Sequence, residues 1–254
     1  VVAGTAIANQ APKVIGVSSS TSDGTYGIGS FIEIKVSFSD AVMVTGMPLL
    51  ILGSAAEPHP SASYQSISDD KKTLTFAYTV REGDSSPDLD VLNDNPFILR
   101  TGDAIKSADA TKDAVLTVPF GASTTGSLAN DKAIVVAGVA PNVVGLSANQ
   151  ENGTYGIGKE LTIGVSFSDA VTLSGDDKPT LQLETGTNDR FATYQSQSND
   201  SKTLYFTYTV QEGDSSTDLD AASSNALQLN GASIKSAVGA NDAVLTLPVG
   251  AMTA

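Results

Sequence analysis

Two short acidic segments hold the residues whose types and spacing could do chemistry. Each has four carboxylates within nine residues: Glu82, Asp84, Asp88 and Asp90 in the first, and Glu212, Asp214, Asp218 and Asp220 in the second. Carboxylate oxygens are hard ligands, so such a segment could wrap around a Ca²⁺ ion. The spacing differs from that of an EF-hand, and Asp, Gly and Ser also form ordinary turns. The sequence therefore leaves two interpretations of each segment, an ordinary turn and a calcium site formed by its four carboxylates.

The same carboxylates could serve a glycosidase, which uses one as an acid and another as a nucleophile or base. Against this, the segment occurs twice and lies among turn-forming residues, and duplicated active sites in tandem copies would be unusual. His59 is the single histidine, and its loop at residues 57–60 has no counterpart in the second half of the chain. A Ser-His-Asp triad would need that loop to be catalytic. We predict that the chain is not an enzyme and has no catalytic residue.

A glycine-rich hexapeptide, Gly-Thr-Tyr-Gly-Ile-Gly, occurs at residues 24–29 and again at residues 153–158. Its spacing, G-x-x-G-x-G, is neither the dinucleotide-binding G-x-G-x-x-G nor the Walker pattern. An alternating strand follows it, whereas a phosphate site needs the N-terminus of a helix. We interpret the glycines as a bend with positive φ that leads into the strand, with Tyr26 and Tyr155 packed across it.

Composition excludes several classes of protein. The 254 residues are 41% hydrophobic, which supports a packed core, and the formal net charge is −14. Such a chain is repelled by nucleic acid and by anionic membranes, and divalent cations are its natural small partners. The absence of cysteine rules out disulfides and Cys-ligated zinc. No stretch is apolar for long enough to span a bilayer, so we expect neither nucleic-acid binding nor membrane insertion.

The elements that position these residues follow an internal repeat. Pro12 matches Pro141, the hexapeptide at 24–29 matches 153–158, and Phe-Ser-Asp-Ala-Val at 38–42 matches 167–171, all 129 positions apart. The acidic segments are 130 apart, and Ile-Lys-Ser at 105–107 returns to the 129 offset at 234–236. The period is far longer than a solenoid unit, so each repeat is predicted to be a domain.

Alternation of apolar and polar residues predicts two strong strands in each copy. The first places Ile32, Ile34, Val36 and Phe38 on one face, and its copy places Leu161, Ile163, Val165 and Phe167. The second places Leu74, Phe76, Tyr78 and Val80 inward, and its copy places Leu204, Phe206, Tyr208 and Val210. Each such strand covers a core on one side.

Weaker strands are predicted at residues 13–17, 49–52, 62–65, 97–99, 114–118 and 133–136, and Ile-Lys-Ser at 105–107 is interpreted as a turn. Seven or more short strands per copy, separated by Gly, Asp, Asn and Ser turns and without a long amphipathic helix, indicate an all-β fold. We predict two tandem immunoglobulin-like β-sandwich repeats of about 129 residues.

The repeat also predicts the domain boundaries. Residues 1–4 read Val-Val-Ala-Gly, as do residues 135–138 at the end of the first copy. We therefore expect residues 1–10 to be the end of a preceding repeat plus a linker, 11–139 to be the first sandwich, and 140–254 to be the second. The second copy has no counterpart of residues 126–135, so its final strand is expected from elsewhere. A longer array of repeats is the favoured source, and a strand-exchanged polymer is the alternative.

The order of motifs resembles a known family of repeats. The order is G-T-Y-G-I-G, a strand ending F-S-D-A-V, then T-L-x-F-x-Y-T-V-x-E-G-D-S-S-x-D-L-D, I-K-S, A-V-L-T-x-P and N-D-K-A-I-V-V. It resembles the tandem repeats of giant extracellular and cell-surface proteins, including adhesin-like arrays and swimming-associated surface proteins, of marine bacteria, cyanobacteria and microalgae. Family members often carry an acidic linker, whereas the linkers at 8–12 and 138–142 contain no carboxylate.

The resemblance implies an extracellular, cell-surface location and a structural role as a spacer or filament-building module. Its partners would be neighbouring repeats of the same chain or identical subunits in a fibre. Two alternatives stay open: a module that binds surface glycans, and a subunit of a strand-exchanged extracellular filament. A glycan-binding module needs exposed aromatic side chains, for which Tyr205 is the candidate. Apart from the possible calcium, no cofactor is expected.

Overall fold

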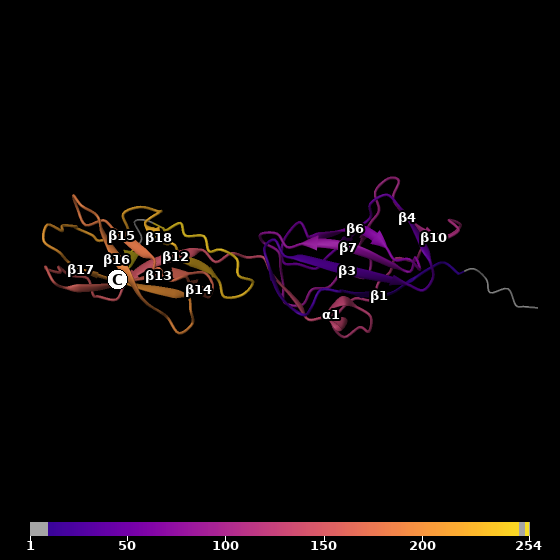
Figure 1. Cartoon of the computed structure of the whole chain (residues 1–254), viewed down its shortest axis with the longest axis horizontal. Helices are drawn as coiled ribbons and strands as arrows, with labels where there is room; N and C mark the ends of the chain where they lie inside the picture. The colour runs from indigo at the N-terminus through magenta and orange to yellow at the C-terminus, as the bar shows by residue number, and fades with distance from the viewer. Residues whose placement is uncertain (1–9, 249–251, 254) are drawn as a thin grey trace, which may run out of the picture. The chain divides into compact units, whose positions relative to one another are not determined.

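The computed structural model describes residues 10–248 and the backbone of residues 252 and 253. The chain divides into two compact units, Val1–Val139 and Ala140–Ala254 (Figure 1). This junction falls where the sequence repeat passes from its first copy to its second. The predicted tail of a preceding repeat at residues 1–10 lies outside the described residues, except for Gln10.

The main sheet of the first unit is antiparallel throughout. Its six strands, in spatial order, are β1 (Val14–Ser18), β3 (Phe31–Phe38), β7 (Thr73–Thr79), β6 (Ser61–Ile67), β5 (Leu49–Ile51) and β9 (Phe97–Ile98). The long strands β3 and β7 pair over seven residues, from Phe31 opposite Thr79 to Ser37 opposite Thr73. This pair is the centre of the sheet and presents the strongest alternation of the sequence.

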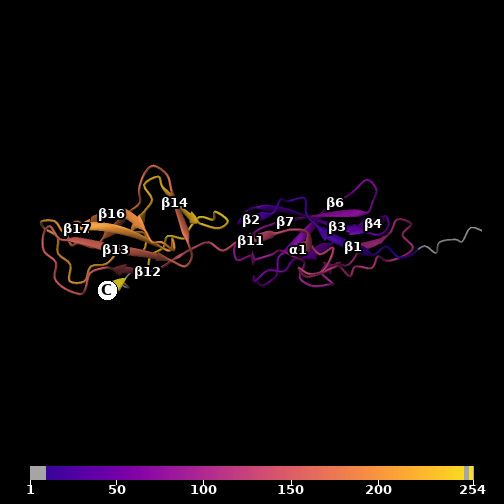
Figure 2. The same ribbon diagram turned by 90° about the horizontal axis from the view of Figure 1, so that it is seen from below.

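Smaller elements complete the first unit. Strand β11 (Ile134–Ala137) lies between β2 (Gly24–Gly27) and β8 (Ser85–Ser86), and β4 (Val42–Thr45) pairs with β10 (Ala104–Ser107). Figure 2 shows β2 and β11 beside each other. A single helical turn, α1 (Leu128–Asp131), precedes β11, and the buried Ser127 caps it by accepting a hydrogen bond from the Asn130 amide.

The second unit repeats the main sheet. Its seven strands, in spatial order, are β18 (Leu227–Gln228), β15 (Thr180–Leu183), β16 (Arg190–Gln197), β17 (Thr203–Thr209), β13 (Glu160–Phe167), β12 (Val143–Ala148) and β20 (Met252–Thr253). Strands β14 (Val171–Ser174) and β19 (Ser233–Ser236) form a separate pair. The pairing of β13 with β17 covers seven residues, as that of β3 with β7 does.

Each unit has one buried hydrophobic cluster, and the predicted inward residues form its centre. Ile32, Ile34 and Val36 have an exposed fraction of 0%. In the first unit the cluster also contains Ile134 and Val136 of β11, so the main sheet and the three-stranded sheet cover one core. The prediction of an all-β chain with two β-sandwich repeats is therefore confirmed.

Several local predictions were wrong. Residues 114–118 form no strand, because Val115 pairs with Lys13 only through an isolated bridge. The expected turn at residues 105–107 belongs to strand β10, which pairs with β4. In the first copy, residues 24–27 of the expected bend form strand β2, and the turn lies at residues 28 and 29, where Gly29 has the expected positive φ, 82°. In these three places tertiary pairing, not local composition, decides the structure.

Candidate functional site

The first acidic segment is a tightly hydrogen-bonded turn at the end of β7. The side chain of Asp84 is 2% exposed, and its Oδ2 accepts a hydrogen bond from the hydroxyl of Tyr78 at 2.8 Å and from the amide of Arg81 at 2.9 Å. The Arg81 guanidinium lies 3.7 Å from the same oxygen. Burial raises the pKa of the Tyr78 hydroxyl well above its usual range, and the bond to Asp84 adds to this. The arrangement fixes the turn.

The second copy rebuilds the same contact. The Tyr208 hydroxyl donates a hydrogen bond to Asp214, whose Oδ2 also accepts from the amide of Gln211 at 2.7 Å. Arg190 Nε lies 3.0 Å from the other carboxylate oxygen. Burial opposes ionisation of Asp214, but the bonds from Tyr208, Gln211 and Arg190 outweigh it and lower its pKa. Burial, followed by the bond to Asp214, raises the pKa of Tyr208 to about 12.

The remaining carboxylates of the segments have separate surroundings. Asp90 and Asp220 each accept from the amide that follows them, and Asp90 also accepts from the amide of Gly121 at 2.8 Å. Burial, followed by the charge of Asp90, raises the pKa of Asp88. Glu82, Glu212 and Asp218 are exposed.

The four carboxylates of each segment are close in the sequence, but the structure does not arrange them around a common point. Over residues 10–248 no group of three or more His, Cys, Asp or Glu side chains is placed to hold a metal ion. The calcium site predicted for Glu82, Asp84, Asp88 and Asp90, and for Glu212, Asp214, Asp218 and Asp220, therefore gains no support from the geometry and stays a prediction.

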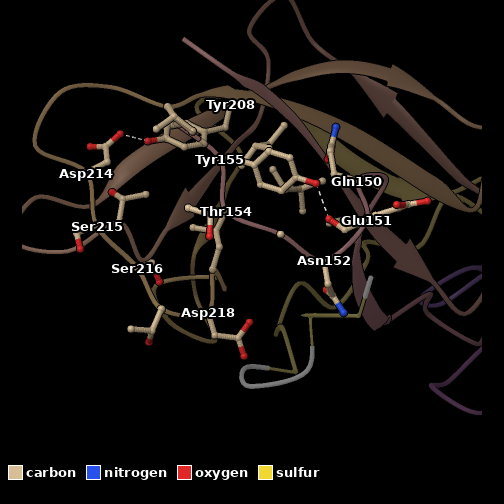
Figure 3. Close-up of a pocket in the computed structure, with 18 residues that line it drawn as sticks. Gln150, Glu151, Asn152, Thr154, Tyr155, Tyr208, Asp214, Ser215, Ser216 and Asp218 are labelled. Atoms are coloured by element: carbon tan, nitrogen blue, oxygen red, sulfur yellow. Dashed lines mark hydrogen bonds between the residues drawn. The ribbon is translucent and has the colours of Figure 1, made fainter. Parts of the chain in front are cut away.

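The second unit contains a groove that the sequence analysis did not locate (Figure 3). Its volume is about 630 Å³. One wall carries Asp214, Ser215 and Ser216, and the opposite wall carries Asn152 and Thr154. Tyr155 and Tyr208 lie at its base, where each makes its hydrogen bond within the unit: Tyr155 donates to the carbonyl oxygen of Glu151, and Tyr208 to Asp214.

The first unit shows what lies between the corresponding segments there. Strand β11 pairs with both of them and fills the space that is a groove in the second unit. This strand runs parallel to β2 and antiparallel to β8. The amide of Gly24 donates to the carbonyl oxygen of Ala133 at 3.0 Å, and the amide of Leu89 donates to that of Ile134 at 2.7 Å. In the second unit the counterparts of β2 and β8, residues 153–156 and 215–216, are not strands. Among the described residues, no strand runs between them.

Side chains along the groove are more exposed than their counterparts beside β11. Leu89 is 1% exposed, whereas Leu219 is half-buried. Ser86 is 7% exposed, whereas Ser216 belongs to the exposed residues. The difference in exposure arises because strand β11 covers Ser86 and Leu89 in the first unit, whereas no described strand covers Ser216 and Leu219. The repeat was the signal for the groove in the sequence, since its offset maps the residues that pair with β11 onto residues that line the groove.

A glycan-binding module would need exposed aromatic side chains, and the structure exposes three phenylalanines among the described residues. Phe31 on β3 is 57% exposed, Phe191 on β16 is 45% exposed, and Phe120, which lies outside the strands and the helix, is 45% exposed. Tyr205, the candidate from the sequence, is half-buried on β17. Glycan binding therefore stays a prediction.

Comparisons with known proteins add little to this geometry. No family model matches the chain, and no curated protein matches it. Among solved structures it is similar to FdeC, described as a broadly conserved Escherichia coli adhesin that elicits protection against urinary tract infections, with a TM-score of 0.36 and 12% sequence identity. The similarity covers 94% of this chain and 63% of the FdeC chain. A likeness of this size does not assign the chain to a family.

Proposed function

We propose that the chain is a structural repeat segment of a large extracellular or cell-surface protein, in which each β-sandwich acts as a spacer or filament-building module. Tandem domains of one fold, each with its own core, can hold a functional region at a distance from the cell. The acidic surface suits such a role, because it keeps a crowded array soluble and apart from anionic membranes.

One observation carries the proposal: the two copies share a buried hydrogen bond whose role is to hold a turn in place. The Tyr78–Asp84 hydrogen bond returns as Tyr208–Asp214, on the same strand and the same turn. In each copy a carboxylate that could have served catalysis is bound to the hydroxyl and amide groups that hold its own turn. A repeated enzyme would instead keep carboxylates free to face a substrate.

No described helix has the length and the apolar surface needed to cross a membrane. The proposed cell-surface location can be tested by labelling. Antibodies raised against this chain should label intact cells of the source organism, and brief protease treatment of those cells should remove the signal. Labelling that requires permeabilised cells would contradict a surface location. A glycan array probed with the folded chain tests the alternative, since saturable binding to one sugar class would favour a glycan-binding module over a spacer.

A further inference from the structure

We propose that the outer face of the main sheet in the second unit binds an uncharged carbohydrate chain, with the ring of Tyr205 as the platform on which a sugar stacks. Leu204 and Phe206, on either side of Tyr205, have an exposed fraction of 0% and belong to the core. Because side chains alternate along a strand, Tyr205 lies on the opposite, outer face. This gives the glycan-binding alternative a specific site in one unit, and it does not depend on the spacer role.

The ring of Tyr205 rests against a glycine of the neighbouring strand. Tyr205 of β17 pairs directly with Gly164 of β13. A Cβ on Gly164 would lie 3.4 Å from the Cε1 atom of the Tyr205 ring, so the ring takes up space beside a side chain's position. Gly164 is buried although it lies on the outer face, whereas Tyr205 is half-buried and keeps part of its side chain accessible. A ring that is already held in place loses little side-chain freedom when it binds a ligand.

The threonines next to this ring form a row across three strands. Thr207 of β17 pairs with Thr193 of β16 on one side and with Thr162 of β13 on the other (Figure 1). Phe191 lies two residues from Thr193 on the same face of β16 and is 45% exposed, so the row separates two aromatic side chains. The Oγ1 atom of Thr207 has no hydrogen-bond partner among the described residues, so turning it towards a ligand breaks no bond.

This combination of a ring and a row of hydroxyl groups fits the surface of a sugar. A pyranose ring presents C–H groups on its faces and hydroxyl groups around its rim. The C–H groups pack on an aromatic ring such as that of Tyr205. The hydroxyl groups pair with threonine side chains, which both donate and accept hydrogen bonds.

The charges of this face favour an uncharged ligand. The outward side chains of β13, β16 and β17 are uncharged, except for Glu160 at the start of β13. Arg190, the first residue of β16, faces the other way and binds Asp214. The formal net charge of the chain is −14, so an acidic polysaccharide is repelled. A protein partner would need a broad apolar core in the contact, whereas here hydroxyl groups separate the two rings.

The first unit keeps the inner face of this sheet but not the outer one. By the repeat offset, Gly164 and Tyr205 correspond to Lys35 and Thr75, which also pair with each other. The Nζ atom of Lys35 lies 3.4 Å from Oε1 of Glu33, with which it forms an ion pair. The second unit thus has a glycine and a ring where the first has a charged group and a short side chain. The site is therefore expected in the second unit alone.

Native gel electrophoresis with a polysaccharide cast into the gel tests the site. The net charge of −14 drives the chain through the gel, and its mobility is measured against a reference protein in the same lane to correct for sieving. The uncharged probes are starch, xylan, galactomannan and a β-glucan, and the acidic probes are alginate and pectate. We expect at least one uncharged probe to retard the chain and neither acidic probe to do so. Unchanged mobility with every uncharged probe, or equal or greater retardation by an acidic probe, would overturn the proposal.

Tyr205→Leu removes the aromatic ring and keeps an apolar side chain beside Gly164, so that the sheet stays covered. It should weaken the retardation several-fold. Phe31→Leu is the matched control, because Phe31 is 57% exposed on β3, the strand of the first unit that corresponds to β13, and its replacement should leave the retardation unchanged. Equal retardation of the parent chain and Tyr205→Leu would overturn the proposal. Circular dichroism checks that each variant folds.

The row of hydroxyl groups is tested by Thr193→Val combined with Thr207→Val, which keeps the shape of both side chains. This double variant should also be retarded several-fold less than the parent chain. Unchanged retardation would overturn a carbohydrate as the ligand, since an apolar ligand needs only the ring.

A gel without polysaccharide tests a second copy of the chain as the occupant. If the parent chain associates with itself there and Tyr205→Leu does not, a second copy covers the face, and the carbohydrate proposal is overturned. The labelling of intact cells that tests the spacer role does not involve this face, so the two proposals can fail separately.

Discussion

The backbone amide of Leu89 donates a 2.7 Å hydrogen bond to the carbonyl oxygen of Ile134, and this bond marks the main difference between the two units. It ties the turn after β8 to strand β11 and places Ile134 in the core with an exposed fraction of 0%. At the corresponding position of the second unit, Leu219 lines a groove. Among the described residues, the two copies of one sequence pattern thus differ at β11 and at the segments that pair with it.

Replacing Gly138 by alanine should destabilise the first unit by about 1–3 kcal/mol, because the new Cβ would collide with the carbonyl oxygens of Arg81 and Asp84. Gly16→Ala is the matched control in the same unit, since its nearest neighbour, the carbonyl oxygen of Gly126, would be at an ordinary 3.5 Å. Urea denaturation followed by circular dichroism measures both. Equal stability of the two variants would show that β11 is not seated as described.

Replacing Tyr78 by phenylalanine should cost about 1–2 kcal/mol, because the buried carboxylate of Asp84 loses its hydroxyl donor. Tyr64→Phe is the control, since its ring packs edge-on against Phe76 and its hydroxyl makes no hydrogen bond to a described residue. The free energy of unfolding, taken from denaturant titrations, compares the two. A larger loss for Tyr64→Phe would contradict a structural role for the Tyr78–Asp84 bond.

Alkaline pH should weaken the second unit through Tyr208. Burial and the bond to Asp214 raise its pKa from 10.0 to about 12, so the unfolded chain releases this proton first. The stabilisation is therefore complete below pH 10 and is lost as the pH rises towards 12. The stability difference between the parent chain and Tyr208→Phe should shrink over this window. A difference that stays constant across it would show that the hydroxyl is not held by Asp214.

If the acidic segments bind calcium, the ion should raise the thermal stability of the chain. An ion that binds only the folded chain, at 100 times its dissociation constant, stabilises it by about 2.7 kcal/mol. The melting temperature should then rise when Ca²⁺ is added to chain stripped with EDTA, and Asp88→Asn combined with Asp218→Asn should reduce the rise. Identical melting curves in EDTA and in Ca²⁺ would rule out the calcium sites.

The strong strands were predictable because their faces alternate without interruption. Ile32, Ile34 and Val36 mark a buried face that no other secondary structure would produce. Strand β2 was not predictable in the same way, because Gly-Thr-Tyr-Gly has low strand propensity and is held by its pairing with β11, more than 100 residues later in the chain. Residues 153–156, which have the same sequence, form no strand in the second unit.

The candidate sites also divide into features that the sequence pattern predicts and features that depend on tertiary contacts. The acidic segments were found from composition, but the partners of Asp84 and Asp214 could not be, since Tyr78 and Tyr208 read as plain core residues. The groove depends on a comparison of two units in three dimensions. Repeat alignment showed which residues of the two copies correspond, and the structure showed that the counterparts of residues beside β11 line a groove in the second unit.

Hydrogen exchange at Leu89 and Leu219 tests the central claim most directly. The two amides hold equivalent positions in one fold, and only Leu89 is bonded to a described strand. The account predicts that the Leu89 amide exchanges far more slowly than that of Leu219. Equal protection of both amides would contradict the account.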